Sequence, residues 1–237
     1  MLAIKRSPLA AAGVIVAALS GASFRMIGPL YGNKVGLSVD QIAIFLSIFV
    51  LGGALSQYPI SWLADRCDRR WVLIWLSVAA IFSCILPAVL PSTNATIVMC
   101  NAAFFGLTTF PIFSVATAHA HDFANADERV ELSAALMFFF ALGAIATPYT
   151  ASELIESYGR SALFLLIATG HVTLVIYGLY CMGMRPTLDE KTPYVYAPWT
   201  SFIVGRLLNG PQTKNNFFGS HHLALEFAGL PRGSDMR

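Results

Sequence analysis

Charge is scarce in this sequence, and so are the residue patterns on which most soluble enzymes depend. Only 12% of its 237 residues are Asp, Glu, Lys or Arg, whereas a soluble globular domain carries about 25%. The net charge of +2 and the lack of a basic patch interleaved with aromatic residues exclude nucleic acid as a partner. The sequence also lacks a G-x-x-x-x-G-K-[ST] loop, so no ATP-driven activity is predicted.

The four cysteines are too few and too scattered to hold a metal ion or a disulfide framework. Cys67, Cys84, Cys100 and Cys181 include no C-x-x-C pair and no zinc-ligand spacing. Three of them lie in apolar runs, where a free cysteine behaves as a small hydrophobic residue. We therefore predict neither a disulfide nor a metal site from these residues.

What the sequence does contain is apolar runs long enough to cross a membrane. Hydrophobic residues make up 56% of the chain, and a helix of about 20 apolar residues spans the hydrocarbon core of a bilayer. This composition predicts an all-α polytopic membrane protein whose residues 1–185 form a bundle of six transmembrane helices. The expected spans are approximately 8–31, 41–63, 71–91, 94–118, 132–154 and 161–183.

The basic residues between these runs are distributed unevenly. Alternate connections are rich or poor in Lys and Arg, which by the positive-inside rule places both termini in the cytoplasm. The rich connections hold Lys5, Arg6, Arg66, Arg69, Arg70, Arg129 and Arg185, and the poor ones hold Lys34 and Arg160. A cleavable signal peptide is the alternative for the first run, but that run is long for one, and its removal would invert the charge bias.

The composition changes after Arg185. Residues 186–237 are rich in Pro, Asn, Gly and charge, which predicts a polar cytoplasmic tail that is disordered in large part. The adjacent His221 and His222 in this tail are interpreted as a solvated pair rather than a metal site.

The connection between the second and third runs concentrates charge in a short motif. It reads Ser61-Trp-Leu-Ala-Asp-Arg-Cys-Asp-Arg-Arg70 and resembles the signature loop of the major facilitator superfamily, written G-x-L-a-D-R-x-G-R-[RK]. Ser61 and Asp68 stand where the family has glycine, so the backbone geometry of the turn is an open question. The resemblance implies a gating role for Asp65, Arg66, Arg69 and Arg70. The alternative is that the arginines only fix the topology or contact lipid phosphates.

Further segments extend the resemblance over residues 5–185, without the tail. Together they are similar to the carboxyl-terminal six helices of YcaD-type bacterial permeases. These segments are Gly28-Pro-Leu-Tyr31, Gln57-Tyr-Pro-Ile60, Phe110-Pro-Ile-Phe113, Ala118-His-Ala-His-Asp122 and Glu128-Arg129-Val130.

The resemblance implies half of a twelve-helix fold in the bacterial inner membrane. The implied function is secondary transport of a small solute by alternating access, with a second six-helix half as partner, either a separate chain or a second copy. A non-transporting scaffold or remnant is the alternative. No acidic residue lies near the centre of a span, and Glu153 lies near the end of one, so a carboxylate for proton coupling would come from the other half.

Polar residues inside the spans are the candidates for binding a substrate. Arg25 could contact an anionic substrate or extend to the membrane interface, and the others could equally bond neighbouring helices. The candidates are Arg25, Gln57, Asn101, Thr108, Thr109 and Tyr149, with Thr147 beside the last. His171 is interpreted as a packing residue, because the sixth helix of each half lies outside the cavity in the resembled fold.

One cluster suggests a different class of protein. His119, His121, Asp122, Asp127 and Glu128 resemble the ligands of a metal-dependent membrane hydrolase. They occupy a single loop, however, and no other connection offers a second group of ligands. The sequence therefore predicts no catalytic residue, no metal and no cofactor.

Overall fold

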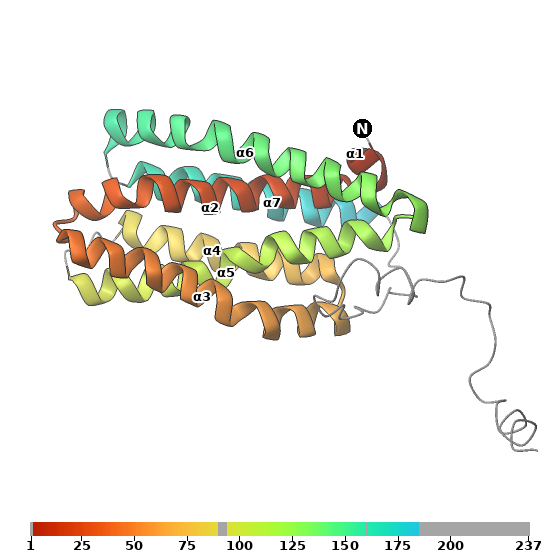
Figure 1. Cartoon of the computed structure of the whole chain (residues 1–237), viewed down its shortest axis with the longest axis horizontal. Coiled ribbons are helices and arrows are strands. Elements are labelled where there is room, and N and C mark those ends of the chain that lie inside the picture. The colour runs from red at the N-terminus through yellow and green to blue at the C-terminus, as the bar shows by residue number, and fades with distance from the viewer. Residues whose placement is uncertain (1, 90–93, 160, 185–237) are drawn as a thin grey trace, which may run out of the picture. The chain divides into compact units, whose positions relative to one another are not determined.

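The computed structural model describes residues 2–89, 94–159 and 161–184, and the regular elements of these residues are helices (Figure 1). They are α1 (Leu2–Arg6), α2 (Pro8–Lys34), α3 (Val39–Arg66), α4 (Arg69–Val89), α5 (Ala95–Asp122), the 3₁₀ turn η1 (Ala126–Glu128), α6 (Arg129–Tyr158) and α7 (Ala162–Met184). Helices α2 to α7 are long and apolar enough to cross a membrane, which confirms the predicted all-α fold with six spans. The predicted tail, residues 186–237, lies outside the described residues.

The helices extend beyond the apolar runs because polar residues cap their ends. Ser38 and Gln41 form a capping box at the start of α3, in which the Gln41 side chain accepts a bond from the Ser38 backbone N–H (2.9 Å). The Asn94 side chain accepts from the Thr96 N–H (2.9 Å) before α5. Gly159 ends α6 with φ of 86°, a conformation that glycine adopts without strain.

Successive long helices run antiparallel, and their packing repeats itself. Helix α2 packs against α6 as α5 packs against α3, and α2 packs against α7 as α5 packs against α4. The pairs α2–α5 and α4–α7 are also in contact. Exchanging α2–α4 with α5–α7 therefore leaves the packing pattern unchanged, as expected of two three-helix repeats of inverted topology. We name the end of the bundle that holds residues 66–70 and 122–129 the arginine end, and the other the opposite end.

Two glycines allow α3 and α5 to pack with their backbones in contact. A Cβ added to Gly106 would overlap the Phe49 carbonyl, and a Cβ on Gly52 would overlap the Ala103 carbonyl. Small residues permit this close approach between membrane helices. The pair α3–α5 is consequently the most extensive helix contact of the bundle.

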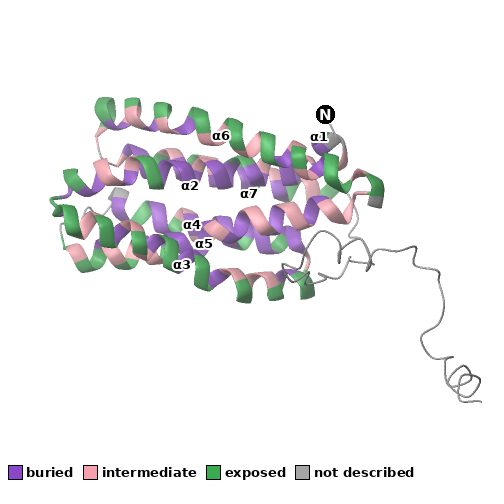
Figure 2. Cartoon of the chain, in the orientation of Figure 1, coloured by how far each residue is buried: buried purple, intermediate pink, exposed green. Residues whose placement is uncertain are grey.

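Helix α2 lies in the interior, and α3 and α6 present exposed faces (Figure 2). Phe24 of α2 stacks on Phe45 and Phe49 of α3 and on Phe105 of α5, with ring centroids 4.2–5.1 Å apart. These rings form the core towards the opposite end. The exposed positions of α3 and α6 include large apolar side chains, which suit contact with lipid or with another protein.

Candidate functional site

Arg69, the first residue of α4, links the ends of three helices at the arginine end. Its guanidinium donates to the Asp65 carboxylate at the end of α3 (3.0 Å), to the Ala118 carbonyl of α5 (3.0 Å) and to the Asp122 carboxylate. The side chains of Arg69 and Asp122 are only 5% and 8% exposed. Charge-assisted bonds of this kind are among the stronger ones in proteins, so Arg69 holds the ends of α3 and α5 to α4.

Asp68 caps α4 at the position where the resembled family has glycine. Its carboxylate accepts bonds from the backbone N–H (2.9 Å) and Nε (3.3 Å) of Arg70. Burial alone would raise the pKa of Asp68, but these bonds and the charge of Arg70 hold that pKa below its usual value. No non-glycine residue in the described part of the chain has a positive φ, and Ser61 lies inside α3. The two departures from the family motif therefore need no glycine conformation.

Arg66 belongs to neither network. It is exposed and lies over the ring of Trp62, with its guanidinium carbon 3.8 Å from the ring centroid, which is a cation–π contact. Of the four predicted gating residues, the structure thus joins Asp65 to Arg69 and pairs Arg70 with Asp68.

A further ion pair lies at the same end. Arg6 of α1 donates to the Glu128 carboxylate of η1 (2.6 Å), and this hydrogen bond lowers the pKa of Glu128. The pair connects the start of the chain to the connection between α5 and α6.

Near the middle of the helices, α2, α3, α5 and α6 surround a cavity of about 260 Å³. Four polar residues line it, one or two from each of α2, α3 and α5, and its remaining wall is apolar. The polar residues are Arg25, Gln57, Thr109 and Ser114, and the others are Ala17, Gly21, Phe110, Phe113, Met137 and Phe140. We name it the central cavity.

The hydroxyl groups of the central cavity already have acceptors. Ser114 Oγ donates to Gln57 Oε1 (3.1 Å), which joins α5 to α3. Thr109 Oγ1 donates to the Phe105 carbonyl one turn earlier (2.8 Å). The Gln57 oxygen is therefore occupied, whereas its amide N–H groups are not used in this bond.

Arg25 turns towards the middle of α2 rather than towards the nearer helix end. Its Nε donates to the Gly21 carbonyl (3.0 Å), and its Nη2 would lie 3.1 Å from a Cβ placed on Gly21. Gly21 is the midpoint of α2, which spans residues 8–34. One of the two interpretations expected the side chain to extend to the membrane interface at the end of its helix. The observed direction differs from that expectation.

The sequence model of the Major Facilitator Superfamily matches residues 10–218 of the chain. The chain belongs to this superfamily. A Yersinia pestis protein named as an uncharacterised MFS-type transporter is 30% identical over 195 residues, which is 82% of this chain and 48% of that protein. The protein named YcaD in Escherichia fergusonii is 29% identical over 170 residues, 71% of this chain and 43% of that protein. The chain spans about half the length of the curated relatives it matches.

Membership confirms the resemblance found in the sequence and supports a role in membrane transport for this integral membrane protein. It also corrects one boundary. The sequence motifs ended at residue 185, whereas the superfamily match continues to residue 218. Part of the predicted tail therefore belongs to the region that is similar to other superfamily members.

The central cavity of this superfamily member gathers three of the six predicted substrate-binding residues, Arg25, Gln57 and Thr109. The other three lie elsewhere. Asn101 accepts a bond from Ser83 of α4 (3.2 Å), and the buried Thr108 hydroxyl donates to the carbonyls of the preceding turn. Tyr149 is 72% exposed on α6, and the neighbouring Thr147 hydroxyl bonds the Gly143 carbonyl.

His171 is fully buried between α7 and α2, away from the central cavity. Its Nε2 lies 2.9 Å from Ser20 Oγ, and the Ser20 hydroxyl also reaches the Val16 carbonyl (2.9 Å). This is the interhelical bond that the packing interpretation expects.

The residues of the suspected metal cluster have separate contacts. Asp122 bonds Arg69, Glu128 bonds Arg6, and His121 Nε2 lies 3.2 Å from Ser133 Oγ. Within the described ranges, no group of three or more His, Cys, Asp or Glu side chains is placed to hold a metal ion. The cluster thus gives no support to a metal-dependent hydrolase.

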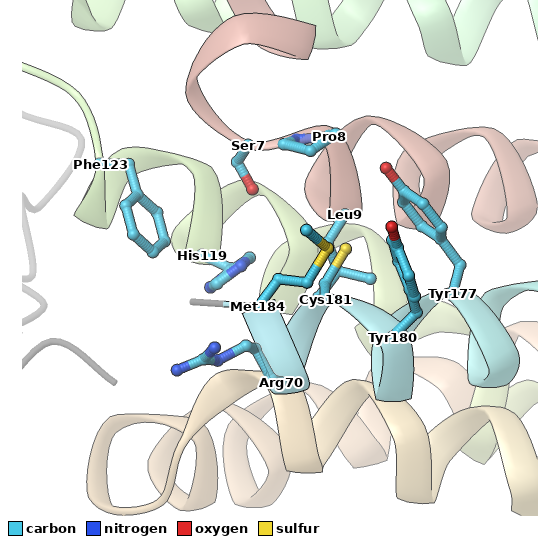
Figure 3. Close-up of a pocket in the computed structure, with 10 residues that line it drawn as sticks. All are labelled: Ser7, Pro8, Leu9, Arg70, His119, Phe123, Tyr177, Tyr180, Cys181 and Met184. Atoms are coloured by element: carbon cyan, nitrogen blue, oxygen red, sulfur yellow. The ribbon is translucent and has the colours of Figure 1, made fainter. Parts of the chain in front are cut away.

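A second cavity, of about 280 Å³, lies at the arginine end between α2, α4, α5 and α7. Figure 3 shows Tyr177 and Tyr180 of α7 on one side and His119 and Phe123 on the other, with Arg70 below them. Because Arg70 lines this cavity and also bonds Asp68, the cavity adjoins the predicted gating loop.

Sequence reasoning missed Asp122 as a partner of Arg69, Asp68 as a cap, and Ser114 and Gly21 in the central cavity. One of these had a usable signal. An acidic residue at the end of the fourth run lies on the same membrane side as the loop of arginines, and opposite charges at one end of a bundle are expected to pair.

Proposed function

We propose that this chain forms one half of a secondary transporter that moves a small solute across the bacterial inner membrane by alternating access. The observation that carries the proposal is the central cavity, which lies near the middle of the spans and is lined by polar residues from α2, α3 and α5. Substrate sites of such transporters lie near the midplane, between two halves that move against each other. In this proposal the second half, a separate chain or a second copy, closes the cavity.

The Arg69 network supports a gate at the arginine end. Its bonds join α3, α4 and α5 in one conformation, so a rearrangement of these helix ends has to break or replace them. Asp65 is the more exposed acidic member, with 38% of its side chain accessible. It is therefore available to the second half or to lipid headgroups, as is the exposed Arg66.

We further propose that the arginine end and both termini face the cytoplasm. Arg6, Arg66, Arg69, Arg70 and Arg129 gather at that end, which agrees with the positive-inside rule. In a chain whose four cysteines are replaced by serine, an impermeant maleimide should label Val39→Cys, at the exposed start of α3, in intact cells and leave Asn125→Cys unlabelled. The reverse labelling would contradict this orientation.

Transport is tested in proteoliposomes that contain the chain alone, or the chain co-purified with the part of the Yersinia pestis relative that it does not match. Uptake of labelled carboxylates, amino acids and sugars is measured in both preparations. We expect saturable uptake of at least one solute, and reduced uptake by the Asp65→Asn variant at equal insertion. If neither preparation moves any solute, the chain is better described as a non-transporting scaffold.

A further inference from the structure

Among the residues that the structure describes, one charged side chain, Arg25, and no carboxylate line the central cavity. Arg25 takes part in none of the ion pairs of the described residues. Its bond from Nε to the Gly21 carbonyl leaves both Nη groups without an acceptor in the part of the chain that the structure describes. A cation at the middle of a span is costly unless it is paired, so this site is suited to receive a negative charge.

The other polar groups of the cavity also favour a ligand that accepts hydrogen bonds. The protons of Ser114 and Thr109 are directed to Gln57 Oε1 and to the Phe105 carbonyl. The remaining donors are the Arg25 Nη groups and the Gln57 amide. A carboxylate only accepts hydrogen bonds, and guanidinium binds it with two parallel bonds.

The apolar part of the cavity wall indicates that the body of the ligand is apolar. Phe110 and Phe113 of α5 and Met137 and Phe140 of α6 form an apolar part of the wall. Aromatic rings favour stacked or edge contacts with a flat apolar group. The part of the cavity that this half forms has a volume of about 260 Å³, and in the proposed transporter the second half completes its wall.

We propose that the central cavity selects small organic monoanions, whose carboxylate binds Arg25 and whose apolar body lies against the phenylalanines. The proposal rests on the proposed function, because it takes this cavity as the transport site. An uncharged solute would leave the guanidinium unpaired, and a cation would be repelled by it. The competing occupant of Arg25 is an acidic side chain of the second half, and the experiment separates the two.

The experiment measures equilibrium binding of two labelled probes, benzoate and its uncharged analogue benzamide. It uses the full chain in a neutral detergent, with and without the co-purified second half. We expect benzamide to bind at least about tenfold more weakly than benzoate, as expected for the loss of one charge-assisted hydrogen bond. Arg25→Gln should abolish this preference and Arg25→Lys should keep part of it. The matched control Arg129→Gln, in which the exposed first residue of α6 is altered outside the cavity, should keep all of it.

Several results would overturn the proposal: equal binding of the two probes, no binding of benzoate, unchanged benzoate binding by Arg25→Gln, or loss of binding once the second half is present. These results are distinguishable from failure of the transport hypothesis. Uptake of an uncharged solute by a preparation that does not bind benzoate would refute the proposed anion site and support the transport function. Benzoate binding by a preparation that moves no solute would support the proposed anion site and refute the transport function.

Discussion

Replacing Arg69 by Gln should destabilise the bundle more than replacing the exposed Arg66 by Gln at the same end. The substitution removes a side chain that is 5% exposed and takes the guanidinium away from Asp122, whose side chain is 8% exposed. Removing one member of a buried ion pair costs about 3–5 kcal/mol, because the remaining charge stays buried and uncompensated. The exposed Arg66, which stacks on Trp62, is the matched control, and Arg66→Gln should cost about 0.5–1 kcal/mol.

The measurement is reversible unfolding in mixed micelles, in which dodecyl sulfate is titrated and helix content is followed by circular dichroism. The double variant Arg69→Gln/Asp122→Asn should recover part of the lost stability, since it also removes the charge of the buried carboxylate. The reasoning is refuted if Arg69→Gln unfolds within 1 kcal/mol of the wild type, an order-of-magnitude limit set by typical exposed pairs. A double variant no more stable than the single one would also refute it.

Three other outcomes are expected. Gly106→Ala should cost about 1–3 kcal/mol in the same unfolding assay, because the added Cβ would overlap the Phe49 carbonyl. Gly183→Ala should cost almost nothing, because no atom of the described residues lies within 4 Å of its Cβ position. Asp65→Asn should cost no more than about 1 kcal/mol, because that carboxylate is 38% exposed, yet it should slow uptake; normal uptake would remove its gating role. The Asp68 cap should contribute its full stabilisation above the ordinary Asp pKa of 3.8, and this contribution should be lost as the pH falls through the lowered pKa of the folded state. In Asp68→Asn the free energy of unfolding should therefore fall less steeply with decreasing pH in the acid range.

The number and order of the spans could be predicted from the sequence, because a lipid-exposed helix needs an apolar run of a certain length. The helix ends were less predictable. Hydropathy falls where polar residues begin, but the helical hydrogen bonds continue through such residues. Helix α5 therefore extends to Asp122 rather than ending near residue 118, and α6 begins at Arg129 rather than near 132.

The central cavity could be predicted only in part. Thr108 and Thr109 are equally polar and adjacent, but successive residues of a helix point about 100° apart, and only Thr109 lines the cavity. Which of the two does so depends on how α5 is rotated against α3, and the sequence does not reveal that rotation. The direction of the Arg25 side chain depends on the absence of a side chain at Gly21, and hydropathy does not predict that direction.

The gating motif could be recognised in the sequence, but the partners of its residues could not be predicted. Its residue types are enough to indicate the family, because the spacing of Asp65, Arg66, Arg69 and Arg70 is specific. The partners of these residues are not identifiable in this way. Asp122 lies 53 residues further along the chain than Arg69, and only the packing of α4 against α5 brings the two together.

That separation in sequence has a consequence for how the protein is made. A ribosome produces the chain from its amino terminus, so Arg69 leaves it 53 residues before Asp122. Once α4 has been made, Asp65, four residues upstream of Arg69 on α3, is the acidic partner that Arg69 already has. The bond to Asp122 can form only after α5 has been made, so Arg69 joins α3 to α4 before it joins either of them to α5.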